Sequence, residues 1–262
     1  MITGNLDTRE FSQALREIMA ISKKEPQKVL RGEAKLVVRD AVRYTPPFGG
    51  RPIHESFMEQ RKAGERTIEQ DINSTFRPLN SLQIAEQPKS KGGAELRKAI
   101  RLKQWRRVEE LLYKLGIVKD MAVRVFAEFP EQLYERLRGG VSRRLRRNKQ
   151  KPFFVVNAAS ITKQKQKRKG DVGLGKSGWK TPAAALGLAL PGWITKHSGP
   201  GLFKDETGNK GEQSITVGNL VGFIQKAGAE LRIMQRALDN RVYSLRTRLE
   251  HALKAMERKN GR

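Results

Sequence analysis

Residues 226–257 read KAGAELRIMQRALDNRVYSLRTRLEHALKAME, and this stretch decides which fold we expect. Apolar residues recur in it at steps of three and four, which is the spacing of one face of an α-helix. The apolar seam consists of Leu231, Met234, Leu238, Val242, Leu245, Leu249, Leu253 and Met256. Because an α-helix rises by about 1.5 Å per residue, this helix would be about 45 Å long. A helix of that length must pack on other helices of the chain or on a neighbouring subunit.

Only short segments of the chain favour β-structure. Residues 153–157 (FFVVN) and 214–219 (SITVGN) are rich in β-branched and aromatic residues, and residues 220–224 are a candidate third strand. Near the N-terminus two helical segments are expected, with Pro26 in the first turn of the second and a stop at residues 45–47 (TPP). These elements predict an α+β fold, in which a small antiparallel sheet packs on long helices.

We expect three parts along the chain. Residues 1–50 supply the N-terminal helices of the core, and residues 51–150 form a large helical insertion with polar loops. Residues 151–262 complete the core with strands, basic and glycine-rich loops and the long C-terminal helix.

The insertion itself has an uneven pattern. Residues 51–92 are polar and irregular, with a weak helical pattern around 59–68. From Ala94 onward Trp105 and several leucines recur at helical spacing, which is typical of a buried helix face. A further helix is expected near 121–129.

The composition excludes several classes of protein. The 262 residues include 53 Lys plus Arg against 27 Asp plus Glu, which gives a formal net charge of +26, and no Cys. Without Cys there is no disulfide framework, thiol nucleophile or Cys-based metal site. No run approaches the roughly 20 apolar residues of a membrane span, and the polar N-terminus does not resemble a signal peptide. We therefore expect a basic protein made without export and without membrane contact.

The positive charge is concentrated between residues 136 and 180, which hold fifteen Lys or Arg and one acid, Asp171. Two dense blocks contribute most of it: Arg143, Arg144, Arg146, Arg147, Lys149 and Lys151, and then Lys163, Lys165, Lys167, Arg168 and Lys169. Such blocks suit contacts with nucleic-acid phosphates. Few aromatic residues lie between them, so the contact would not depend on base sequence. An acidic protein neighbour, or a basic loop without a specific partner, also fits this pattern.

One motif invites an enzymatic interpretation. Gly170 and the run Gly175-Lys176-Ser177 have the spacing of a phosphate-binding P-loop. A P-loop follows a buried strand and opens a helix, whereas here a lysine-rich run precedes the motif and Pro182 follows closely. We interpret the segment as a flexible glycine loop that positions Trp179.

No other residues suggest catalysis or metal binding. His54, His197 and His251 are scattered, and none shares a metal-ligand spacing with another His or with paired carboxylates. Metal-dependent nucleases need clustered carboxylates, but residues 140–200 contain only Asp171. We expect no enzyme activity, no metal and no cofactor.

Four segments carry a resemblance to a known family. Residues 34–50 (AKLVVRDAVRYTPPFGG), followed by Glu55-Ser56-Phe57, are a helix that runs into prolines and a glycine turn. Residues 215–228 (ITVGNLVGFIQKAG) are a strand that ends in Asn before a glycine and a helix. Together with residues 176–179 (KSGW) and 191–194 (PGWI), these segments make the chain resemble the tail-component family of tailed bacteriophages, which comprises neck and tail-completion proteins. The chain departs from the family pattern at residues 48–52 and in the long insertion.

The resemblance implies a structural role without enzyme activity. It predicts a virion protein at the head–tail interface, assembled in the host cytoplasm, with a small core repeated in a ring around the DNA channel. The expected partners are copies of the chain, other neck, portal, adaptor or tail proteins, and packaged double-stranded DNA. We expect subunit contacts through Trp179, Trp193, Leu238, Leu245 and Leu249. The alternative is a free nucleic-acid-binding protein without sequence preference.

Overall fold

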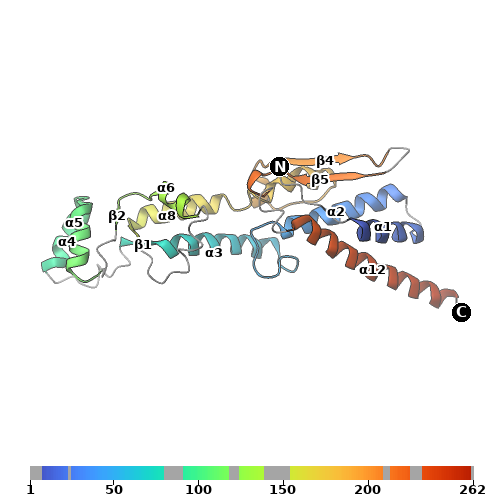
Figure 1. Cartoon of the computed structure of the whole chain (residues 1–262), viewed down its shortest axis with the longest axis horizontal. Helices are drawn as coiled ribbons and strands as arrows, with labels where there is room; N and C mark the ends of the chain where they lie inside the picture. Colours follow the sequence, from blue (N-terminus) through green and yellow to red (C-terminus); the bar gives the residue numbers. More distant parts are fainter. Residues whose placement is uncertain are drawn as a thin grey trace. The chain divides into compact units, whose positions relative to one another are not determined.

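The structure is a computed structural model that describes residues 8–22, 25–79, 91–117, 124–138, 154–208, 213–224 and 232–260. These residues form two compact units, which are described separately: unit 1 is Met1–Gly64 with Asp171–Arg262, and unit 2 is Glu65–Gly170 (Figure 1). The inserted unit therefore runs from Glu65 to Gly170, whereas the sequence suggested 51–150. The boundaries differ because the helix that starts at Phe57 carries the chain out of unit 1, and the second basic block is a helix of unit 2.

Helices dominate both units. Unit 1 contains α1 (Arg9–Ile21), α2 (Pro26–Tyr44), the 3₁₀-helix η2 (Ser177–Trp179), α9 (Lys180–Ala185), α10 (Gly192–Thr195), β4 (Gly201–Asp205), β5 (Ile215–Asn219) and α12 (Ile233–Asn260). α3 (Phe57–Thr75) begins in unit 1 and continues into unit 2. Unit 2 further contains β1 (Phe76–Pro78), α4 (Lys91–Arg101), α5 (Trp105–Lys114), β2 (Val125–Phe126), α6 (Glu131–Arg138), β3 (Phe154–Val156) and α8 (Ala158–Gly170). Among these described helices none is long and apolar enough to cross a membrane.

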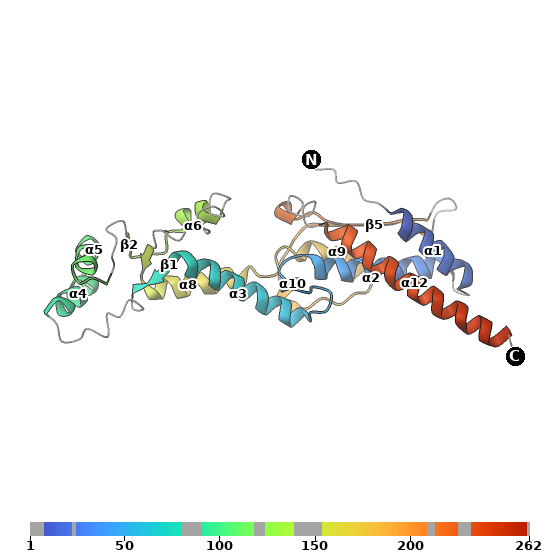
Figure 2. The same cartoon turned by 60° about the horizontal axis from the view of Figure 1, so that its bottom comes forward.

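The long C-terminal helix is confirmed and forms the centre of unit 1. α12 packs against both α1 and α2, and the three helices lie side by side (Figures 1 and 2). Their shared core contains Ala14, Leu15, Ile18, Val29, Leu245 and Leu249. The helix begins at Ile233 rather than near residue 226, and residues 225–231 lie outside the described residues.

The predicted antiparallel sheet is also confirmed. β4 and β5 pair from Gly201↔Asn219 to Asp205↔Ile215. The candidate third strand at 220–224 is wrong, because residues 222–224 form a helical turn. Asn219 explains the change, since its side-chain Oδ1 accepts from the backbone N–H of Val221 at 3.0 Å and turns the chain away from the sheet.

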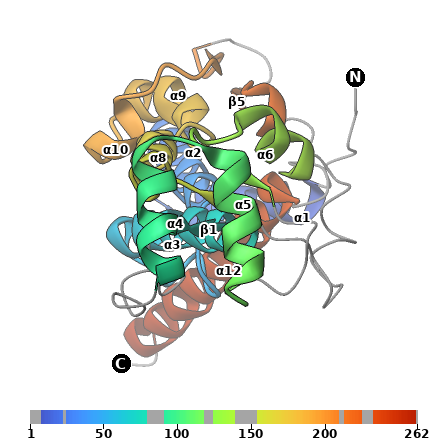
Figure 3. The same ribbon diagram turned by 90° about the vertical axis from the view of Figure 1, so that its left-hand side faces the viewer.

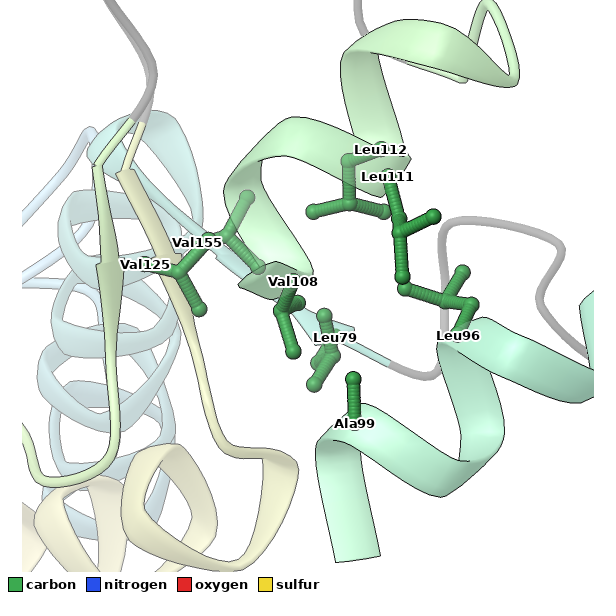
Figure 4. Packing of buried hydrophobic residues seen from close by; sticks show 8 residues of the cluster. All are labelled: Leu79, Leu96, Ala99, Val108, Leu111, Leu112, Val125 and Val155. Carbon is green, nitrogen blue, oxygen red and sulfur yellow. The ribbon is translucent and has the colours of Figure 1, made fainter. Parts of the chain in front are cut away.

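Unit 2 is built on a small parallel sheet with the strand order β1-β3-β2. The strand expected at 153–157 is its central strand, β3. α4 and α5 form a helical hairpin (Figure 3) that contributes Leu96, Val108 and Leu111 to the same cluster as Val125 and Val155 (Figure 4). A second cluster, with Ile72, Phe76, Tyr134, Val156 and Ile161, joins the sheet to α3, α6 and α8. The short sheet therefore connects two hydrophobic clusters.

One expectation for the insertion is extended and two are wrong. The weak helical pattern around 59–68 is part of a longer helix, α3, which spans residues 57–75. Ser56 and Glu59 start this helix with a reciprocal capping box: Ser56 N–H donates to Glu59 Oε2 at 2.7 Å, and Glu59 N–H donates to Ser56 Oγ at 3.2 Å. The helix expected near 121–129 is replaced by β2, whose edge pairs with β3. The second basic block is not a loop but lies in α8, where Asn157 Oδ1 accepts the N–H of Ala159 at 3.0 Å.

Candidate functional site: a buried junction around Lys176

Described parts of residues 34–50, 176–179, 191–194 and 215–228 meet at one place in unit 1. The glycine loop and η2 lie against the C-terminal end of α2, the start of α3, α10 and the end of β5. We call this set of contacts the Lys176 junction, and we define it by Lys176, Trp179, Thr45, Gln60 and Asn219.

The side chain of Lys176 is the centre of the junction and is 0% exposed. Its Nζ donates to the carbonyl oxygen of Val42 at 2.6 Å, to that of Thr45 and to Oε1 of Gln60 at 3.0 Å. Val42 lies in the last turn of α2, where carbonyl groups have no partner within the helix. Lys176 therefore caps the C-terminus of α2 with a positive charge, as the helix dipole favours.

Burial sets the protonation of this lysine. Loss of hydration lowers the pKa of Lys176 to about 7, although the negative charge of Glu55 acts in the opposite direction. The amine therefore loses its proton close to neutral pH while it keeps hydrogen-bond donors for the carbonyl groups around it.

Gln60 and Trp179 complete the polar contacts. The amide of Gln60 donates to the carbonyl oxygens of Arg43 at 3.2 Å and of Pro52 at 2.8 Å, so one side chain ties α3 to the loop after α2. The indole Nε1 of Trp179 donates to Oγ1 of Thr45 at 2.8 Å. As expected, the glycine loop positions Trp179, but it does so as a packed element of the core.

Glycine is required where the loop meets the hairpin. The side-chain amide of Asn219 donates to the carbonyl oxygen of Gly175 at 2.8 Å. A Cβ on Gly178 would overlap Oδ1 of Asn219, and a Cβ on Gly201 would overlap the carbonyl oxygen of Gly178. Gly178 and Gly201 therefore allow the loop and the hairpin to approach closely, and the motif residue Gly175 packs against the side chains of Phe223 and Ile224.

This geometry does not support nucleotide binding at the P-loop-like motif. A P-loop lysine must reach the phosphates of a bound nucleotide, whereas Nζ of Lys176 is enclosed and already faces three oxygen acceptors of the protein. The match to the motif reflects a structural lysine.

The five residues expected at a subunit interface are all buried within unit 1. Trp179 and Trp193 lie in the loop region, and Leu238, Leu245 and Leu249 lie on the face of α12 that forms the core. Their apolar character is explained by packing within the chain, so they do not offer a surface to a neighbouring subunit. The sequence could not separate the two roles, because both need the same helical spacing.

The structure describes only the second of the two basic blocks expected to contact nucleic acid or an acidic partner. The first, Arg143, Arg144, Arg146, Arg147, Lys149 and Lys151, lies outside the described residues. In the second block, Lys167 pairs with Glu131 at 2.9 Å, Arg168 pairs with Glu131 and Glu135, and Lys169 pairs with Glu69. Lys163 is exposed and Lys165 is partly exposed. Three of the five cations in this block are thus engaged by carboxylates of their own unit.

The part of the chain that the structure describes contains no group of three or more His, Cys, Asp or Glu residues that could hold a metal ion. His197 lies near the junction, where its Nε2 is 3.1 Å from the carbonyl oxygen of Val172.

Comparison of the chain with protein-family models, with curated proteins and with solved structures finds no match.

Proposed function

We propose that the chain is a structural virion protein of a tailed phage that acts at the head–tail interface as a neck or tail-completion protein. It would assemble with copies of itself in a ring around the DNA channel, next to portal, adaptor or tail proteins. The observation that supports this proposal best is the Lys176 junction, because the four segments that resemble the phage family meet there as one packed core.

Exposed apolar residues of unit 1 give the proposed ring candidate contact surfaces. On α12 the apolar seam continues past the core to Leu253 and Met256, which are 50% and 45% exposed. Near the base of the hairpin, Leu202, Leu220 and Phe223 are also exposed. Leu253 and Met256 lie three residues apart on α12 and offer one candidate contact, and the residues near the hairpin offer a second, as head-to-tail contacts in a ring require.

The alternative is a free nucleic-acid-binding protein without sequence preference. The net charge of +26 favours it. The ion pairs of α8 weaken it, because they reduce the positive charge that the second block can offer to phosphates. We therefore rank the virion protein first.

The native mass of the full chain separates these functions. Light scattering at low and high salt, with and without duplex DNA, should give a closed oligomer that persists at high salt. A monomer at every salt concentration that binds DNA only at low salt would contradict the autonomous ring and favour the free DNA-binding protein.

The end of α12 provides a sharper test of the ring. The double substitution Leu253→Gln and Met256→Gln should convert the oligomer to monomers at high salt, because it removes apolar contact surface without a change in charge. Both side chains are exposed, so the free energy of unfolding of the monomer should change by less than about 0.5 kcal/mol. Tyr243→Gln is the matched control, since Tyr243 is 75% exposed on the same helix. An oligomer that survives the double substitution would remove this helix end from the interface.

A further inference from the structure

The turn between α4 and α5 carries exposed positive charge that has no carboxylate partner among the described residues. α4 ends at Arg101, α5 begins at Trp105, and the connection is tight: the N–H of Gln104 donates to the carbonyl oxygen of Ala99 at 3.0 Å. Lys103 takes a left-handed backbone conformation, with φ of 56°, in this turn. The fold thus brings the end of one helix and the start of the next into one corner of unit 2.

Four exposed cations lie at this corner, and we call them the basic turn: Lys98, Arg101, Lys103 and Arg106. The carboxylates of the same hairpin are engaged elsewhere. Arg107 pairs with Glu95 at 2.6 Å and with Glu110 at 2.9 Å. Glu109 accepts the backbone N–H of Val125 at 2.7 Å. Within the described residues, no carboxylate pairs with any of the four cations.

The positive charges at this corner repel one another, and one of them opposes a helix dipole. Lys98 and Arg101 lie in the last turn of α4, where the dipole favours cations, but Arg106 does not have this advantage. Arg106 stands in the first turn of α5, which contains no acidic residue. A positive charge is unfavourable at a helix N-terminus, where the dipole is itself positive. An external polyanion would relieve both effects.

We infer that the basic turn binds the phosphate backbone of double-stranded nucleic acid. Interfaces with nucleic acids are strongly positive, whereas the centre of a protein–protein interface is depleted of Lys and enriched in aromatic side chains. At the turn the exposed apolar contribution is Leu102, and the indole of Trp105 packs against the core of the hairpin. With no exposed aromatic stack, the contact reads no base sequence.

The apolar faces of α4 and α5 argue against a membrane as the partner. A helix that lies on a bilayer inserts an apolar face into it. Here Leu96, Val108, Leu111 and Leu112 are buried in the cluster that contains the sheet residues Val125 and Val155 (Figure 4). The buried apolar face is therefore not available to a bilayer, whereas the charged corner is exposed.

This inference rests on the proposed function only for the identity of the polyanion as packaged duplex DNA. It does not depend on a ring. Charge counted along the chain points to the two basic blocks and not to this corner, because the cations of the corner are spread over two helices.

The test compares two variants of the full chain that lose equal charge. One variant carries Arg101→Gln, Lys103→Gln and Arg106→Gln, and the other carries Lys163→Gln, Lys165→Gln and Lys167→Gln on α8. Duplex DNA binding is measured by fluorescence anisotropy from about 50 to 200 mM salt, the range over which such affinities fall steeply. Circular dichroism checks that both variants keep the helical content of the wild type.

The basic-turn variant should lose more than about tenfold in affinity, and its plot of log affinity against log salt should be less steep by about 3. The α8 variant should keep most of the slope, since Lys167 is already paired with Glu131. Equal losses in both variants would show a response to net charge alone and overturn the inference. So would no loss in the basic-turn variant, or wild-type binding to phosphatidylserine vesicles without binding to DNA. A monomer whose DNA binding is lost in the basic-turn variant would support the inference and contradict the ring.

Discussion

Replacement of Lys176 by methionine should lower the free energy of unfolding by about 2 kcal/mol at pH 9. Methionine has a similar length but donates no hydrogen bond. At pH 9 the neutral amine has two N–H groups, which it shares among the carbonyl oxygens of Val42 and Thr45 and Oε1 of Gln60 in a buried place. A net loss of about 1 kcal/mol for each of the two hydrogen bonds gives the expected value. Urea denaturation followed by tryptophan fluorescence measures it.

The effect of this substitution should depend on pH. The pKa of Lys176 is about 7 in the folded chain and near 10.5 when the side chain is hydrated. The unfolded chain therefore binds more protons between these values, so the stability of the wild type rises with pH across this range, by on the order of 1 kcal/mol per pH unit. Methionine does not titrate, so residue 176 adds no pH dependence to the stability of the variant. The difference between wild type and variant should fall below about 1 kcal/mol at pH 6, where the wild type carries the full cost of a buried charge.

Lys196→Met is the matched control, because Lys196 is exposed in the same unit. It should change the free energy of unfolding by less than about 0.5 kcal/mol at either pH. If the Lys176→Met protein were as stable as the wild type at pH 9, and had lost an ability to bind nucleotide, the P-loop interpretation would return.

The example of Lys176 shows which part of the structure was accessible from the sequence. The sequence marked the residue, but its partners Val42 and Gln60 are 134 and 116 positions away. Helical spacing reports local structure and cannot identify such contacts. The long helix was predictable because its seam repeats over many turns. β5 was predictable from its β-rich segment, whereas its partner β4 was not among the expected strands.

The parallel sheet of unit 2 and the full length of α3 were not predicted from the sequence, for different reasons. The parallel sheet of unit 2 has strands of two or three residues, which are too short to show an alternating pattern. α3, by contrast, had a readable start in Ser56 and Glu59, the pair that forms its capping box. The basic turn could have been found by counting charge across predicted helix ends rather than along the chain.

A second large effect is expected where α2 meets α12. The carboxylate of Glu33 is 3% exposed and accepts from Nε and Nη2 of Arg241 at 3.2 and 2.9 Å, and Arg241 is 5% exposed. The substitution Glu33→Ala leaves the guanidinium of Arg241 buried without a counter-charge, so the free energy of unfolding should fall by about 4 kcal/mol. The double substitution Glu33→Leu and Arg241→Leu should recover most of this loss, because it removes both buried charges and fills the space with apolar atoms. Arg248, which also pairs with Glu33 at 2.7 Å, has a side chain that is 53% exposed and can be hydrated by water.

The control for this prediction is an exposed ion pair at the start of the same helix, α2. Glu25 and Lys28 form an exposed pair at 3.2 Å, and Glu25→Ala should cost less than about 1 kcal/mol. A loss after Glu33→Ala as small as that of the control would mean that water reaches Arg241 and that the pair is not buried in solution. Chemical denaturation of all three variants decides between these outcomes.

The double variant also tests whether the buried pair sets the register of α12 on α2. Another buried polar contact joins the helices besides the Glu33 pairs with Arg241 and Arg248, since Nδ2 of Asn240 donates to Oδ2 of Asp40 at 2.7 Å and Asp40 is fully buried. If either contact is enough to fix the register, Glu33→Leu with Arg241→Leu will still unfold in one cooperative transition. Adding Asp40→Leu and Asn240→Leu should then leave apolar helix faces that can slide past one another, because apolar contacts alone specify position weakly. A broadened transition in the fourfold variant, with a sharp one in the double variant, would assign the register to these polar contacts. A sharp transition in both would assign it to side-chain packing around Ala237 and Leu245.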